Sequence, residues 1–205
     1  MNYLAHLHLA PDDVEARIGN LLGDFLKPAH AQHLPATMQS AMQLHRWIDQ
    51  FTDSHPIVAE CKTWIASERQ RYAGILIDIY FDHFLARHWA QFDQRALRDF
   101  SQQVYAELIE YDSILPKKLH EILPSMVKFD WLTGYQDLER IEQVLAGFAR
   151  HRIRRQSHFA AGIDDLQRYY SHFEKAFLAF YPDLIAQTQL QAQYQMAINR
   201  QTIQK

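Results

Sequence analysis

The sequence predicts an all-α protein, an irregular multi-helix bundle that forms a single domain over residues 1–205. Three observations predict this fold class. Apolar residues recur at helical spacing along most of the chain. Only 6 glycines and 7 prolines are present, too few for the many turns of a β-sandwich or barrel of this length. The 205 residues are 48% hydrophobic, which suffices for a sizeable core in one domain.

The first two expected helices lie at residues 12–25 and 37–53. Asp12 is expected to cap the first helix, and Pro28 to end it. Pro56 is expected to end the second helix, because proline cannot continue the hydrogen-bond ladder. The apolar residues at helical spacing are Val14, Ile18, Leu21, Leu22 and Phe25 in the first helix, and Ala41, Leu44, Ile48 and Phe51 in the second.

The next expected helix, over residues 75–89, is apolar nearly all round, which indicates a central helix that is buried on most sides. Apolar periodicity predicts three further helices, over residues 97–108, 138–148 and 166–180, and the last should break at Pro182. Internal repeats, low-complexity tracts and Gly/Ser linkers are missing from the sequence, so we expect no domain boundary.

Composition limits the compartment and the partners. Cys61 is the single cysteine, so the chain cannot form an internal disulfide, as is usual in the reducing cytoplasm. No apolar run approaches the roughly 20 residues that span a bilayer, and the first residues lack the basic region of a signal peptide. The formal net charge of −3 disfavours general nucleic-acid binding. We therefore expect a cytoplasmic protein with neither a membrane nor a nucleic acid as partner; the sequence predicts no oligomeric state.

Polar side chains recur four residues apart, which puts both members of each pair on one helix face. Imidazole nitrogens and carboxylate oxygens are ligands that divalent metals accept together. A few helices with two such residues each can therefore build a metal site inside a bundle. The pairs are Asn2 with His6, Asn20 with Asp24, His45 with Asp49, and Asp78 with Asp82, which His83 follows directly.

Asp78, Asp82 and His83 interrupt the expected central helix, where the neighbouring residues are apolar. An ionised carboxylate in an apolar interior is normally neutralised, paired or bound to metal. We interpret these residues as part of a metal site. The alternative is that the two aspartates cap loops or pair with Arg71 and Arg87.

Asp24 projects away from the apolar stripe of its helix, so the pattern alone does not place it against the core. Gly19 and Gly23 lie on the same side, however, and glycines four apart permit close approach of another part of the protein. His6 and His8 are two residues apart and cannot share a helix face. We therefore expect only one of these histidines to be a ligand, and choose His6.

Five segments of the N-terminal half together resemble the acyl carrier protein phosphodiesterase family in their order and spacing. The resemblance covers residues 2–89, whereas the chain beyond residue 100 contributes only similar length and helical character. The segments are Asn2-Tyr3-Leu4-Ala5-His6-Leu7, Gly19-Asn20-Leu21-Leu22-Gly23-Asp24, His45-Arg46-Trp47-Ile48-Asp49, Phe51-Thr52-Asp53, and Asp82-His83-Phe84-Leu85 with Trp89.

This family is regarded as an atypical branch of the HD phosphohydrolases, which are helical enzymes with His and Asp ligands. The resemblance implies an HD-phosphohydrolase-like fold and a divalent metal, most often Mn²⁺. It also implies hydrolysis of the 4′-phosphopantetheine group from holo acyl carrier protein, which gives apo acyl carrier protein. Asp82-His83 stands in reversed order relative to the HD signature, so the ligands of ordinary HD enzymes cannot be transferred residue by residue.

Pattern and resemblance together suggest roles for individual residues. Asp78 is expected as a catalytic residue that orients or deprotonates water, and Asp24 as both a ligand and a catalytic residue. Arg150 and Arg154, four apart in the densest cationic stretch, are expected to bind the acidic carrier; the alternative is that they only stabilise a helix C-terminus. The expected metal ligands are His6, Asp24, His45, Asp49, Asp82 and His83.

Two other functions remain open at this stage. An HD-type hydrolase acting on a nucleotide or another small phosphoester would use the same metal site on a different substrate. A non-enzymatic helical adaptor would make the His and Asp residues incidental and use the aromatic C-terminal half as an interaction surface. A di-iron carboxylate enzyme is disfavoured, because the sequence lacks the Glu-x-x-His motif on two helices.

Overall fold

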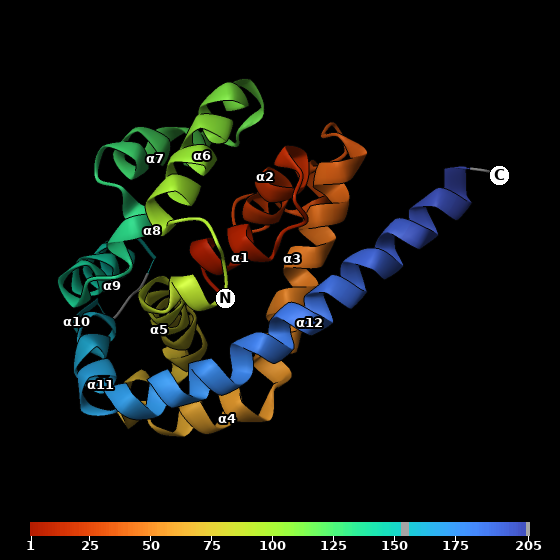
Figure 1. Ribbon diagram of the computed structural model, residues 1–205. Coiled ribbons are helices and arrows are strands. Elements are labelled where there is room, and N and C mark those ends of the chain that lie inside the picture. Colours follow the sequence, from red (N-terminus) through yellow and green to blue (C-terminus); the bar gives the residue numbers. More distant parts are fainter. Residues whose placement is uncertain (153–155, 204–205) are drawn as a thin grey trace.

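The computed structural model describes residues 1–152 and 156–203, and over these ranges it is all-α, as predicted (Figure 1). The α-helices are α1 (Tyr3–Leu9), α2 (Val14–Leu22), α3 (Ala36–Ser54), α4 (Pro56–Thr63), α5 (Ala73–Arg87), α6 (Leu97–Glu110), α7 (Lys117–Lys128), α8 (Trp131–Gly134), α9 (Leu138–Arg152), α10 (Gln156–Ala160), α11 (Gly162–Arg168) and α12 (Tyr170–Ile203). Short 3₁₀ helices are η1 (Pro28–His30), η2 (Ser67–Tyr72), η3 (Trp89–Gln91) and η4 (Asp112–Ile114).

α5 is the central helix of the bundle, which confirms the expectation from its apolar sequence. Helices α1, α4, α9 and α12 all pack against it. Most of its residues are buried, among them Tyr80, Phe81 and Phe84. A helix that is enclosed in this way needs apolar side chains on nearly every face. Its two buried polar residues, Asp82 and His83, must therefore find partners inside the protein.

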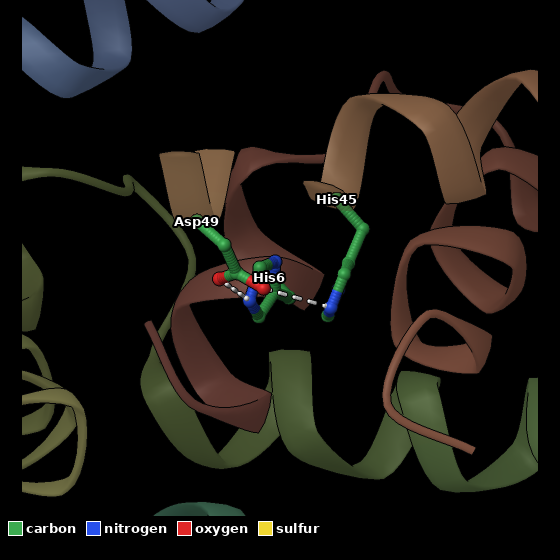
Figure 2. A group of neighbouring side chains, drawn as sticks. All are labelled: His6, His45 and Asp49. Carbon is green, nitrogen blue, oxygen red and sulfur yellow. Dashed lines mark hydrogen bonds and ion pairs between the residues drawn. The ribbon is translucent and has the colours of Figure 1, made fainter. Parts of the chain in front are cut away.

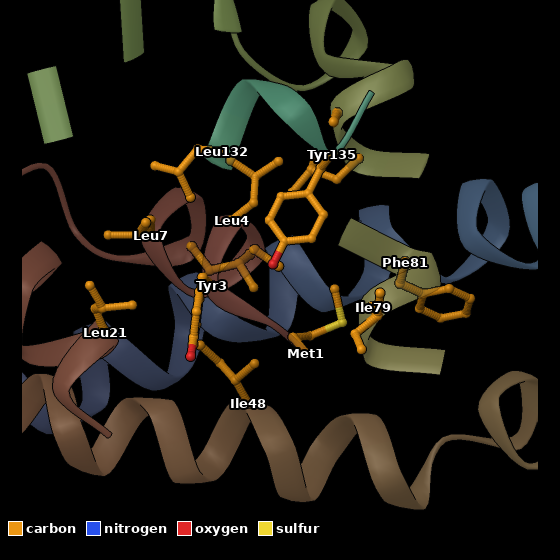
Figure 3. Packing of buried hydrophobic residues seen from close by; sticks show 14 of the residues in the cluster. Met1, Tyr3, Leu4, Leu7, Leu21, Ile48, Ile79, Phe81, Leu132 and Tyr135 are labelled. Atoms are coloured by element: carbon orange, nitrogen blue, oxygen red, sulfur yellow. The ribbon is translucent and has the colours of Figure 1, made fainter. Parts of the chain in front are cut away.

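α2 packs along α3, and glycine makes this close contact possible. A Cβ atom added to Gly19 would lie 2.5 Å from the backbone oxygen of Met38, so a larger residue would force the two helices apart. The expectation that the glycine side of this helix contacts other parts of the protein is confirmed. Figure 3 shows buried side chains of α1, α3, α5 and the segment after α8 in one core, among them Leu4, Ile48 and Tyr135.

The first predicted helix is shorter than expected, and its cap is the neighbouring residue. Asp13 has extended backbone angles, and its carboxylate accepts a hydrogen bond from the Ala16 amide at 2.8 Å. Asp12, which we expected to be the cap, instead accepts a hydrogen bond from Arg17 at 3.4 Å. The prediction was wrong by one residue, because two adjacent aspartates carry the same capping signal.

α12 continues through Pro182, where we expected the helix to break. Proline inside a helix removes a backbone donor and costs about 3 kcal/mol. Four fully buried side chains surround this position, and each contributes about 1.5–3 kcal/mol through its burial, so tertiary packing outweighs the proline. They are Phe177, Phe180, Tyr181 and Leu184. Beyond them the C-terminal part of α12 extends away from the other helices (Figure 1). Within residues 1–152 and 156–203, α12 included, no helix combines the length and the apolar character of a membrane span.

Candidate functional site

His6, His45 and Asp49 meet between α1 and α3 (Figure 2). Nε2 of His6 lies 3.1 Å from Oδ1 of Asp49, and Nε2 of His45 lies 3.2 Å from Oδ2 of the same carboxylate. One ligand atom from each residue lies within 4.8 Å of the other two. We call this group the His-His-Asp cluster. It unites His6, from the first segment of the chain, with His45 and Asp49, for which a spacing of four predicted a common helix face.

Two neighbours limit the position of the His45 ring. Gly23 follows the last residue of α2, and a Cβ atom at this position would overlap the ring carbons of His45. The ring of His6 stacks on the ring of His45, with centroids 3.8 Å apart and an angle of 24° between the planes. The glycine is therefore needed for close approach of a side chain that belongs to the cluster.

The cluster combines an ionised carboxylate with a neutral imidazole. Burial, together with the nearby His45, lowers the pKa of His6 to about 3, although its contact with Asp49 acts in the opposite direction. Burial raises the pKa of Asp49, but hydrogen bonds from His45 and His6 and the charge of the Met1 ammonium bring it well below its usual range. At neutral pH His6 is therefore uncharged and has a nitrogen lone pair available to a ligand, and Asp49 has an anionic oxygen.

Each imidazole also has an unused nitrogen. A carboxylate can only accept, so the ring nitrogen that faces Asp49 must be the donor in this arrangement. The Nδ1 atoms of His6 and His45 are buried, and among the described residues they have no hydrogen-bond partner. Buried polar atoms without partners are rare, and a bound ion or a catalytic role is one explanation for them. The rings thus have bonding capacity that the protein itself does not use.

The Met1 ammonium connects the cluster to Asp78. Its nitrogen lies 3.3 Å from Oδ1 of Asp49 and 3.0 Å from Oδ1 of Asp78. Burial lowers the pKa of this ammonium, but the charges of the two carboxylates raise it by more. Together these effects raise the pKa to about 11. A cation thus already lies between two carboxylates, and the expected catalytic residue Asp78 borders the cluster.

A pocket of about 220 Å³, which we call the Ile75 pocket, is joined to the cluster through Met1, a lining residue whose ammonium contacts Asp49. Asp24 and Asp78 both line it, so the two residues that we expected to be catalytic border one cavity. Asp24 is exposed. The complete lining consists of Met1, Asn2, Tyr3, Asp24, Tyr72, Ile75, Asp78, Ile79 and Phe148.

Asp82 lies outside the cluster and contacts the start of α1. Its two carboxylate oxygens accept hydrogen bonds from the backbone amides of Leu4, at 2.7 Å, and Ala5, at 3.2 Å. These amides belong to the first turn of α1, where the helix itself provides no acceptors. Burial raises the pKa of Asp82 to about 7, even though the two amides act to lower it. Its contacts are those of a helix cap, and its role as a ligand stays a prediction.

His83 also lies outside the cluster, on another face of α5. Its Nδ1 donates to the backbone oxygen of Tyr135 at 2.7 Å, and its Nε2 accepts from the hydroxyl of Tyr170 at 2.9 Å. Burial lowers the pKa of His83 to about 4. Both ring nitrogens therefore have protein partners, whereas His6 and His45 each have one only at Nε2. The metal role of His83 stays a prediction.

The predicted docking arginines cannot be placed by contacts. Arg150 belongs to the last turns of α9, but its side chain lies outside the described residues, as does all of Arg154. Their role in binding an acidic carrier stays a prediction.

Sequence reasoning missed the Met1 ammonium, Tyr135 and the apolar wall of the Ile75 pocket. Asn2, which we paired with His6, donates instead to the Tyr135 hydroxyl at 2.7 Å. These partners are 133 residues apart, and helical spacing contains no signal for such a contact. The sequence contains no signal for Ile75 either, because its 42% exposure on a helix that is apolar nearly all round is visible only in the structure.

Comparison with known proteins gives consistent matches along the chain. The sequence model of a family described as acyl carrier protein phosphodiesterase matches residues 1–184. A protein of that name from Serratia proteamaculans (strain 568) is 35% identical over 188 residues, which cover 91% of this chain and 97% of the relative. One from Yersinia pestis is 33% identical, with 92% of this chain and 98% of the relative covered. One from Salmonella agona (strain SL483) is 35% identical, with 91% and 97% covered. No solved structure matches significantly.

Proposed function

The chain belongs to the acyl carrier protein phosphodiesterase family, and from this membership we propose that it hydrolyses the phosphodiester between 4′-phosphopantetheine and holo acyl carrier protein. Water adds to phosphorus, the bond from phosphorus to the oxygen of the carrier serine breaks, and that oxygen takes up a proton. The products are apo acyl carrier protein and 4′-phosphopantetheine. The observation that best supports this chemistry is the His-His-Asp cluster, which the Met1 ammonium joins to a pocket bordered by two further aspartates.

We propose that His6, His45 and Asp49 hold a divalent metal, and that this metal is Mn²⁺. Two nitrogens and one carboxylate are a ligand set that first-row metals accept. Three protein ligands leave positions open for water and substrate, as in other catalytic metal sites. The unpartnered Nδ1 atoms support the fit, because the two buried rings are incompletely bonded within the protein. When bound, such a metal acts as a Lewis acid toward the phosphodiester and lowers the pKa of water.

Asp78 is the proposed base. Burial raises the pKa of its carboxyl group, although the Met1 ammonium acts in the opposite direction. A carboxylate with a raised pKa accepts a proton more readily than an ordinary aspartate does. Asp24 borders the same pocket, and its proposed role is to orient water or to complete the ligand set. Arg150 and Arg154 are proposed to bind the acidic carrier, and the cytoplasm is the proposed location of the reaction.

Incubation of the purified protein with holo acyl carrier protein and Mn²⁺ tests this function, with mass spectrometry of the carrier as the readout. We expect the carrier to lose the mass of one phosphopantetheine. Thorough chelation should stop the reaction and added Mn²⁺ should restore it. Cyclic nucleotides and small phosphoesters, tested in parallel, cover the alternative substrate class. An unchanged carrier with rapid nucleotide hydrolysis would replace the proposed substrate, and activity after complete chelation would exclude the metal mechanism.

A further inference from the structure

One wall of the Ile75 pocket is apolar, although the proposed reaction site near it, the His-His-Asp cluster, is polar. Ile75 and Ile79 lie four residues apart on α5 and present one face to the pocket. Tyr72 and Phe148 complete this wall from other segments. Asp78, on the same helix, connects the wall to the cluster through the Met1 ammonium. A substrate whose phosphate binds at the cluster can therefore meet this apolar surface only by extending its adjoining group past Met1.

The charges of the pocket indicate which part of a substrate it accepts. Its charged lining groups are the carboxylates of Asp24 and Asp78 and the ammonium of Met1, so two negative charges face one positive charge. A negative surplus at short range disfavours an anion. The phosphate of the substrate should therefore stay at the metal ligands. A neutral group that adjoins the phosphate suits the pocket.

The size of the pocket limits this group further. Sites for drug-sized ligands have volumes of about 300–1,000 Å³, whereas this pocket measures about 220 Å³. It can hold only part of a long, flexible arm. Ile75 is 42% exposed, which places it at the solvent-facing rim of the pocket. A longer ligand can therefore leave the pocket past this residue.

We propose, building on the function above, that the Ile75 pocket binds the neutral, branched pantoyl end of the 4′-phosphopantetheine arm and that Ile75 determines specificity for it. The pantoyl group adjoins the phosphate and has two methyl groups on one carbon. These methyl groups give the apolar wall a compact group to bury, and the amide-rich remainder of the arm extends past Ile75 into solvent. A phosphodiester with an unbranched alcohol lacks this contact, so the pocket discriminates between arms that share the same phosphate.

Saturation-transfer NMR with pantetheine and chelated protein tests the contact without turnover. Pantetheine has no phosphate and needs no metal. We expect the geminal methyl protons to receive the strongest saturation, and N-acetylcysteamine, which lacks the pantoyl group, to receive little. The signal should fall at least threefold in Ile75→Ser and also in Ile75→Trp, which fills the pocket. Ile109→Ser is the matched control, because Ile109 is an exposed isoleucine on α6, and its signal should equal that of the wild type.

Kinetics provide a second readout. Ile75→Ser should lower kcat/KM for holo carrier about three- to tenfold, mainly through KM, and this loss should be several times larger than any loss on methyl 4-nitrophenyl phosphate, which has no pantoyl group. Strongest saturation at the cysteamine end, or equal saturation in Ile75→Ser and wild type, would overturn the pantoyl assignment even if holo carrier is hydrolysed. Absence of carrier hydrolysis in the wild type would instead refute the proposed function, so the two failures are distinguishable.

Discussion

The imidazole rings of His6 and His45 lie almost parallel, with their centroids 3.8 Å apart. Two rings at this distance inside a protein cannot both take up a proton without strong repulsion. The pKa of His6, lowered to about 3 by burial and then by its neighbour, reflects this arrangement. The pair is therefore suited to share a metal cation, because a metal binds to lone pairs that protonation would remove.

Gly23→Ala should impair the metal site although residue 23 has no ligand atom. The added methyl group would overlap the ring of His45, so the imidazole must move away from Asp49. We expect Mn²⁺ affinity to fall at least tenfold, measured by the electron paramagnetic resonance signal of free Mn²⁺. Gly147→Ala is the control, because a Cβ atom there meets nothing within 4 Å; it should keep the affinity and stabilise α9 by about 0.5–1 kcal/mol. Equal Mn²⁺ binding in both variants would mean that His45 is not a ligand.

Asp49→Asn and Asp82→Asn should separate metal binding from helix capping. Asp49→Asn removes the anionic oxygen of the cluster, and we expect at least a tenfold loss of Mn²⁺ affinity with an unchanged circular-dichroism spectrum. Asp82→Asn leaves one oxygen for two amides of α1, so the free energy of unfolding should decrease by about 1–3 kcal/mol. The Mn²⁺ affinity of this variant should stay within twofold of wild type. Comparable losses of affinity in both variants would put Asp82 in the ligand set, as the sequence suggested.

The stability of the chelated protein should decrease in mild acid because of His83. Its pKa is lowered from 6.5 in the unfolded chain to about 4 in the folded protein. As the pH falls from 6.5 toward 4, the unfolded chain gains a proton there and the folded protein does not, so the free energy of unfolding decreases. The loss is at most about 3 kcal/mol, and below pH 4 this residue causes no further loss.

Urea unfolding at pH 7 and pH 4.5 measures this effect. His83→Gln should lose less stability between the two pH values than wild type does, and substitution of the exposed His33 by Gln is the matched control. The pKa values of His6 and Asp82 also differ between the folded and unfolded states. Only the comparison of the variant with wild type therefore isolates the contribution of His83 to the pH dependence. An identical pH dependence in His83→Gln and wild type would contradict the assignment.

The double change of Arg150 and Arg154 to Glu tests carrier docking. Electrostatic docking acts mainly on the association rate and is screened by salt. We therefore expect a higher KM for holo carrier and a flatter dependence of kcat/KM on ionic strength, with hydrolysis of a small phosphodiester nearly unchanged. Equal loss on both substrates would show that the two arginines serve the fold or the catalytic phosphate.

Helical periodicity predicted the fold class and the main helices, because burial on one face leaves a regular trace in the sequence. It also predicted His45 with Asp49, since a spacing of four fixes their common face. It failed at Pro182, where neighbouring residues such as Phe180 and Tyr181 are buried because α12 packs against α3, α4 and α5, which are distant in the sequence. Local patterns show the penalty of a proline, whereas the compensating contacts come from distant helices.

The polar residues of α5 show the same limit within the site. The sequence indicated that Asp82 and His83 are buried and must be compensated, and both are. It could not indicate the compensating partner, because backbone amides of Leu4 and Ala5 satisfy a carboxylate as a metal does. The residues in these two contacts are separated by 78 and 77 positions in the sequence. Only the packing of α1 on α5 brings them together.

The position of the Met1 nitrogen affects how the protein can be handled. An affinity tag fused ahead of this residue would convert the ammonium into an amide, which removes the positive charge between Asp49 and Asp78. The two carboxylates would then repel each other beside the cluster, and the added chain would have to leave a buried position. The last turns of α12 extend away from this region (Figure 1). Purification handles, fluorophores and surface tethers therefore belong at the C-terminus.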